Sequence, residues 1–427
     1  MTRTDREHIT FLARTILGGS RPAARVRSPP LLARLADKAS FLLGTEVTLV
    51  GFASQIPDIF ALSGLTTAVV VYTPRFIELT TAYRFALLTK ASASERRALA
   101  RTFFSEMLSA KLVREGSVDA ALRVFLASWL HAPPLMLGSQ WRLDSILQDQ
   151  HVTQLTVVVG YGLAHEVGHF VTFPDQSTPA MLIDSIDRTL VHVLASMGDR
   201  PGRPVRISPS DQADLAAHAR QTPDHPLNPR HIFDEVAADL FAWDVMFNLA
   251  HDVAMDSGMQ YDPIPVACEI YVQMMVIYFA ERAEVNSRNV GTRPTDWDSA
   301  TRYAFHDASV EVRSRMVGML LAELFAAHYP AGRTREAMKD AIVASLAELD
   351  LILRPDFREF ERGISSAMQA ADRGDAIDQD MVDLLGAATL RLAKGDEYFT
   401  QDAREFCRLV GETEAPGMHI FRGLVGK

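Results

Sequence analysis

Cysteine is scarce in this sequence. The 427 residues contain only two, Cys268 and Cys407, which lie far apart in the chain. Two cysteines so placed cannot form a disulfide framework or a zinc site built from thiolates. The simplest interpretation is a pair of reduced thiols, which is typical of cytoplasmic proteins, and we expect a cytoplasmic location.

The sequence also lacks a long uncharged apolar segment. A membrane-spanning helix needs about 20 predominantly apolar residues. The most apolar stretches, residues 152–164 and 270–280, are shorter or end in charged residues. The opening residues, MTRTDREHITFLARTIL, contain early acids and no apolar core followed by small residues. We therefore expect no membrane span and no signal peptide.

Basic residues are outnumbered by acidic ones. The chain has 43 lysines and arginines against 53 aspartates and glutamates, which gives a formal net charge of -10. A net negative charge disfavours contact with a phosphate backbone, so we predict no nucleic-acid partner. Hydrophobic residues make up 48% of the chain, which is enough for a large core.

Hydrophobic periodicity predicts mostly helices, with two short strands near the N-terminus. Residues 31–44 have helical spacing and end at Gly44, a residue that favours a helix C-terminus. Residues 45–52 and 66–74 are short and rich in β-branched side chains, which indicates strands. Beyond about residue 255 nearly all patterns are those of amphipathic helices.

Two longer segments are predicted as helices that carry polar motifs. Residues 152–173 have apolar side chains nearly all round, which is typical of a buried helix, and Pro174 is expected to end it. A second helix is predicted over residues 229–250, with Asn228 as its N-cap and a proline in its first turn. The fold class expected from these patterns is α+β, predominantly helical, with a small β-sheet.

The stretch VVVGYGLAHEVGHFVTFPDQ, residues 157–176, places three chemically active side chains in an apolar background. On a helix, His165 and His169 project from one face, one turn apart. Such a pair can bind a single Zn²⁺, and Glu166 between them can take a proton from an attacking water. The alternative is a buried network in which the imidazoles and the carboxylate satisfy one another.

A third protein ligand is expected because catalytic zinc usually has three. The best candidate is Glu235 in DEVAADLFAWD. Asp239 follows one turn later and can accept the outer N–H of a ligating histidine, which fixes the tautomer of that histidine. Small residues at positions 237, 238 and 242 predict that the two helices approach closely. The alternative for both acids is a solvated first turn of a helix.

HEVGH followed downstream by DEVAAD resembles the gluzincin group of zinc metallopeptidases. Within that group the chain looks most like the CAAX-prenyl-protease-like peptidases, including their soluble members, and the Lit-type phage-exclusion peptidases. The resemblance implies a zincin-like core, a Zn²⁺ cofactor and Glu235 as the third ligand. It also implies a strand whose edge pairs with an extended substrate, and residues 66–74 are expected to fill that role.

The resemblance also suggests a domain organisation. Residues 1–44 are expected to form an N-terminal helical arm, residues 45–329 a zincin-like metallopeptidase domain, and residues 330–427 a helical C-terminal region. The C-terminal region carries alternating acids and bases on amphipathic patterns and contains no chemical motif. It is therefore a candidate surface for a protein partner.

Candidates for stabilising a transition state are weaker. The prenyl-protease group often carries a His-Pro pair followed by an arginine. AFHDASVEVRSR supplies His306 and Arg313, but without the proline and with a spacing one residue longer. His231, one turn before Glu235, is a second candidate. For both histidines the alternative is an ordinary polar residue on a helix, and Tyr278 is expected to be a core aromatic.

The sequence thus predicts a zinc-dependent endopeptidase that hydrolyses peptide bonds in an intracellular protein substrate. Glu166 is the expected general base, and His165, His169 and Glu235 are the expected metal ligands. The alternative is a catalytically inactive metal-binding regulatory or scaffold protein that acts through its C-terminal helices.

Overall fold

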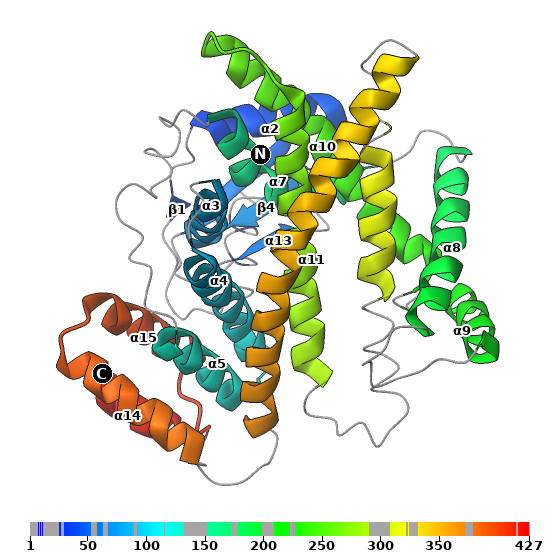
Figure 1. The fold of residues 1–427 in the computed structure, drawn as a ribbon. Coiled ribbons are helices and arrows are strands. Elements are labelled where there is room, and N and C mark those ends of the chain that lie inside the picture. The colour runs from blue at the N-terminus through cyan, green and yellow to red at the C-terminus, as the bar shows by residue number, and fades with distance from the viewer. Residues whose placement is uncertain are drawn as a thin grey trace.

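Figure 1 shows the fold of the chain in a computed structural model. It describes residues 7, 9, 11, 25–26, 30–52, 58–62, 67–88, 92–114, 116–131, 152–171, 177–198, 209–222, 225, 227–289, 308–321, 323, 332–371, 379–415 and 417–426. Over these residues the chain is mostly helical and carries one small sheet, which agrees with the α+β, predominantly helical class expected from the sequence.

The sheet has four strands in the order β1-β2-β4-β3. Strands β2 (Val47–Phe52) and β4 (Ala68–Tyr72) are parallel and confirm the two strands predicted from the sequence. Strands β1 (Arg25–Val26) and β3 (Ile59–Leu62) pair antiparallel to them at the two edges. Strand β4 is buried on both faces, which explains its nearly continuous run of valines.

The sheet corrects one expectation about the substrate-binding edge. Within the predicted stretch 66–74, residues 68–72 form the inner strand β4, which pairs on one side with β2 and on the other with β3. It therefore has no free edge for an extended substrate, and that prediction was wrong. The edge strand is β3, whose sequence IFAL is too short and too poor in β-branched residues to be recognised as a strand.

Helices pack against this sheet and continue beyond it. Their bounds are α2 (Pro30–Leu43), α3 (Pro74–Leu88), α4 (Ala93–Arg114), α5 (Val118–His131), α7 (Val152–Gly168), α8 (Ser177–Gly198), α9 (Pro209–Gln221), α10 (Pro229–Asp256), α11 (Pro263–Asn289), α13 (Arg333–Ala371), α14 (Gln379–Ala393), α15 (Glu397–Val410) and α16 (Met418–Val425). Residues 308–321 are also helical. No helix in the described ranges is long and apolar enough to cross a bilayer.

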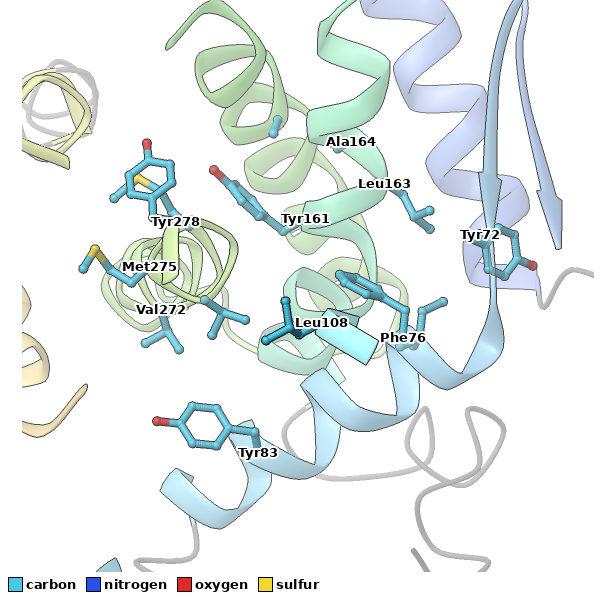
Figure 2. Close-up of a cluster of buried hydrophobic side chains, with 14 of the residues drawn as sticks. Tyr72, Phe76, Tyr83, Leu108, Tyr161, Leu163, Ala164, Val272, Met275 and Tyr278 are labelled. Carbon is cyan, nitrogen blue, oxygen red and sulfur yellow. The ribbon is translucent and has the colours of Figure 1, made fainter. Parts of the chain in front are cut away.

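Helix α7 lies at the centre and packs against α2, α3, α10, α11 and the sheet. Figure 2 shows how its side chains Tyr161 and Leu163 meet residues of α11 and the start of α3. This explains why its sequence is apolar on nearly all sides. The predicted helix 152–173 was too long, because α7 ends at Gly168. The amides of Phe170 and Val171 donate to carbonyls three residues earlier, which closes a tighter turn well before Pro174.

Helix α10 begins as the sequence predicted. The Asn228 side chain accepts a hydrogen bond from the amide of Arg230, and a proline occupies the first turn. The helix continues to Asp256, six residues beyond the predicted end. Its extra turns carry the apolar residues Val253 and Ala254, which are buried, so packing extends the helix past the expected limit.

The C-terminal helices pack onto the rest of the molecule. The long helix α13 contacts α4, α5 and α11, and in Figure 1 it runs across the molecule beside α11. Helices α14, α15 and α16 pack on one another, and α14 also contacts α5. Aromatic rings join α5 to this group, with Phe125 stacked on Phe406 and Trp129 edge-on to Phe399. The domain boundaries expected at residues 44 and 329 stay predictions.

Candidate metal centre

Helix α7, the turn that follows it and helix α10 bring together the three ligands proposed from the sequence. His169, predicted on the same helix as His165, lies in the turn just after α7 ends. His165, His169 and Glu235 each offer one ligand atom, and these atoms all lie within 4.8 Å of one another. The Nε2 atom of His165 is 3.5 Å from Oε2 of Glu235, and the Nε2 atom of His169 is 4.0 Å from its Oε1. Two atoms that each bind one zinc ion at about 2 Å lie about 3.3 Å apart in a tetrahedral site, so the cluster is close to binding geometry.

The close approach of the two helices depends on small residues. A Cβ added to Gly168 would lie 2.5 Å from Cα of Ala238 and 2.7 Å from its carbonyl oxygen. The two backbones therefore touch between the histidine pair and Glu235. The sequence predicted this approach from the small residues of the second helix, and the structure places Ala238 at the contact.

The three ligands differ in exposure. The side chain of His165 is 3% exposed, whereas those of Glu235 and His169 are 23% and 30% exposed. The cluster is thus buried on the His165 side and open to solvent on the His169 side. A water molecule can reach this open side, as a catalytic metal site requires.

Asp239 fixes the ring of His165. Its Oδ1 atom lies 2.9 Å from Nδ1 of His165 and also accepts a hydrogen bond of 2.9 Å from the Tyr161 hydroxyl. Its Oδ2 atom accepts a 2.5 Å hydrogen bond from the hydroxyl of Tyr278. Figure 2 shows the rings of Tyr161 and Tyr278, from α7 and α11, next to each other. With Nδ1 engaged by Asp239, the Nε2 atom of His165 faces Glu235 and is available as a ligand.

Arg313, from the helical residues 308–321, compensates the negative charge of Glu235 and Asp239. Its guanidinium lies 2.9 Å from Oε2 of Glu235 and 3.6 Å from Oδ2 of Asp239. It also stacks over the ring of Tyr278, 4.4 Å from the ring centroid. Two carboxylates in one buried cluster would repel each other, and a planar cation between them compensates that charge.

The charges of the cluster shift the pKa values of its members. Burial by itself lowers the pKa of His165, but the Asp239 carboxylate outweighs it and raises this pKa well above its usual range. Burial by itself raises the pKa of Glu235, but Arg313 and His165 outweigh it and hold this pKa well below its usual range. A cation that binds at Nε2 of His165 must therefore displace a proton.

Glu166 sits beside the cluster and outside the ligand set. Its side chain is partly buried, and its Oε2 atom accepts a 2.9 Å hydrogen bond from the main-chain amide of Ala61 on β3. Burial raises the pKa of Glu166 to about 7, against the opposing effects of His165 and the Ala61 amide. A carboxylate with a pKa near neutrality is suited to take up and return a proton.

The remaining candidates are placed less favourably or lie outside the described residues. His231 is exposed on the first turn of α10, and His306 lies outside the described residues. Tyr278 is a buried aromatic as expected, yet its hydroxyl also reaches Asp239, which the sequence did not predict. Tyr161 was missed as well, although its position four residues before His165 put it on the same helix face.

Comparisons with protein-family models, curated proteins and solved structures find no match to this chain. The chemistry of the site follows from its own donor set. That set is two imidazoles and a carboxylate around one point, a second carboxylate behind one imidazole, and a third carboxylate beside them.

Proposed function

We propose that the protein is a zinc-dependent endopeptidase of the gluzincin type with a zincin-like core. The observation that carries the proposal is the convergence of His165 on α7, His169 in the turn after it and Glu235 on α10, with Glu166 beside them. Two imidazoles, one carboxylate and an open side fit the pattern of catalytic zinc, which keeps one position for water. The same donors also accept Mn²⁺, Fe²⁺ or Co²⁺, and the resemblance of the two motifs to gluzincins favours zinc.

The residues of the chain have distinct roles in this proposal. A bound zinc ion supplies a Lewis acid that polarises the scissile carbonyl and activates water. Glu166 takes the proton of the attacking water and returns it to the leaving amine. Asp239 keeps His165 in the tautomer that leaves Nε2 free to bind the metal. Arg313 holds the Glu235 carboxylate in its ionised form.

The proposed substrate is an extended polypeptide. Strand β3 lies at the edge of the sheet among the described residues, and Ala61 in this strand reaches Glu166. A polypeptide that ran along this edge would pass the general base. Because Glu166 engages the outward amide of Ala61, the polypeptide would pair with the other outward main-chain groups of the strand. This assigns to β3 the role that the sequence had suggested for residues 66–74.

The test combines metal analysis with two variants. We expect about one zinc ion per purified chain, lost in His165→Ala because a ligand is removed. Glu166→Gln keeps its zinc but loses activity on the order of 10²- to 10⁴-fold, measured on a library of peptides derived from a cell lysate. Full activity in Glu166→Gln would show that the mechanism is wrong. A wild-type protein that holds zinc and cleaves nothing would show that it is not a peptidase.

A second candidate function has one observation in its favour. The C-terminal helices α13 and α14 expose several large apolar side chains, namely Val343, Leu351, Ile352, Val382 and Leu390. Exposed apolar side chains that form a contiguous patch mark protein-interaction surfaces, and partner binding through these helices would require such a patch. A metal-binding regulatory or scaffold protein acting through these helices would bind zinc and a partner without hydrolysing peptides.

A further inference from the structure

The main-chain groups of β3 alternate in direction. Asp58, just before the strand, accepts a hydrogen bond from the amide of Thr73, which follows β4. In an antiparallel pair only every second residue exchanges hydrogen bonds with the neighbouring strand. Asp58 is one of the residues that exchange hydrogen bonds with the neighbouring strand. Phe60 and Leu62, two and four residues later, therefore direct their amides towards β4, and Ala61 directs its amide away from it. The hydrogen bond from Ala61 to Glu166 agrees with this direction.

Strand β3 is pressed against the face of α7 that carries Glu166. A Cβ added to Gly162 would lie 2.8 Å from Cδ1 of Ile59, so the missing side chain lets the strand approach the helix. Gly162 and Glu166 are four residues apart and therefore lie on the same face of α7. The approach at Gly162 brings the Ala61 amide within 2.9 Å of Glu166 one turn later.

We propose that the main-chain amide of Ala61 positions the general base Glu166. Strand β3 would then orient Glu166 and also border the substrate path. The inference rests on the proposed function of the site. The amide belongs to a strand tied to β4 and cannot rotate away as a side-chain donor can. A hydrogen bond from an N–H group to a carboxylate is also stronger than one between neutral partners. It holds Oε2 of Glu166 and leaves Oε1 for the attacking water.

The first test measures the contact without measuring activity. In zinc-loaded protein labelled with ¹³C-phenylalanine and ¹⁵N-alanine, the amide signals of the six Phe-Ala pairs of the chain are selected, and the Ala61 signal is identified by its absence in Ala61→Gly. We expect Glu166→Ala to move this signal upfield and to speed its exchange with solvent about tenfold or more, and Glu166→Gln to have an intermediate effect. The Phe241–Ala242 pair in α10 is the internal control and should not change. An unchanged Ala61 signal in both variants would overturn the proposal.

The second test removes the donor itself. Proline at position 61 deletes the amide hydrogen but no hydrogen bond to β4, because that amide points away from the strand. We expect Ala61→Pro to keep its zinc and its KM but to lose about tenfold to a hundredfold in kcat. The comparison variant Ala61→Gly keeps the donor and should lose clearly less kcat than Ala61→Pro. Unchanged kcat in Ala61→Pro would contradict the positioning role.

The two tests separate this inference from the proposed function. If the wild-type protein binds zinc and hydrolyses nothing, the peptidase proposal fails while the amide signal still decides whether Ala61 holds Glu166. If Ala61→Pro does not fold, as its zinc content and thermal unfolding would show, the amide signal in the Glu166 variants decides the question alone.

Discussion

At the scale of single residues, the geometry of the candidate metal centre depends most on Asp239. This buried carboxylate contacts the ring of His165 and accepts hydrogen bonds from the hydroxyls of Tyr161 and Tyr278. Its position four residues after Glu235 allowed this contact with a histidine to be predicted from the sequence. The two tyrosines were not predicted, because they lie in apolar helices where an aromatic ring is most simply explained by packing.

Replacing Asp239 by asparagine should weaken zinc binding. The substitution preserves shape but removes the charge that favours Nδ1–H on His165, and loss of such a partner carboxylate typically costs about 10- to 100-fold in metal affinity. The affinity can be measured by competition with a chromogenic chelator.

The matched control is Asp234→Asn, which makes the same change on an exposed side chain of the same helix. Its zinc affinity should equal that of the wild type. Equal affinity in Asp239→Asn would mean that the aspartate does not orient the ligand.

At the scale of secondary-structure elements, the site depends on how closely α7 and α10 approach. The sequence predicted both helices, the cap of the second, and the face of each that carries the ligands. It did not predict that α7 ends at Gly168, because its apolar pattern continues beyond that residue. Strand β3 and its Ala61 amide were also missed, since a main-chain donor has no side-chain signature.

Replacing Gly168 by alanine should push the two helices apart. The new methyl group would meet the backbone of Ala238 at 2.5 Å, and backbone atoms cannot move aside as a flexible side chain can. We expect a loss of zinc and a destabilisation of about 1–3 kcal/mol from overpacking. Zinc content and thermal unfolding would measure both effects.

A suitable comparison is Gly386→Ala in α14, where an added Cβ would meet no atom within 4 Å. This variant should be neutral or slightly more stable, because alanine favours a helix over glycine by about 1 kcal/mol. Normal zinc content in Gly168→Ala would show that the helix contact does not set the ligand spacing.

At the scale of the whole molecule, a second charged cluster links the C-terminal helices to the elements that follow the sheet. Arg75, in the first turn of α3, makes two hydrogen bonds of 2.9 and 2.8 Å to Glu106 of α4. Asp402 of α15 interacts electrostatically with both residues. Burial and then Glu106 raise the pKa of Asp402 to about 7, with Arg75 opposing them.

This shift predicts a dependence of stability on pH. The ordinary pKa of the aspartate is 3.8, so between about pH 4 and pH 7 the folded chain binds more protons at Asp402 than the unfolded chain does. The contribution of this group to stability is therefore complete below that window and is lost as the pH rises through it. Asp402→Asn, which cannot ionise, should raise the melting temperature relative to the wild type more at pH 7.5 than at pH 5.

Asp383→Asn provides the comparison, because Asp383 is an exposed acid on the neighbouring helix α14. Its effect on the melting temperature should be small and alike at both pH values. A difference between Asp402→Asn and wild type that does not change with pH would contradict the assignment.

The unequal exposure of the two imidazoles has a consequence for how the centre is loaded. An ion that arrives from solvent meets His169 first and reaches His165 last, after the proton there has left. On the proposed function, a chelator would also approach from the His169 side, so it would displace this exposed imidazole before the buried His165.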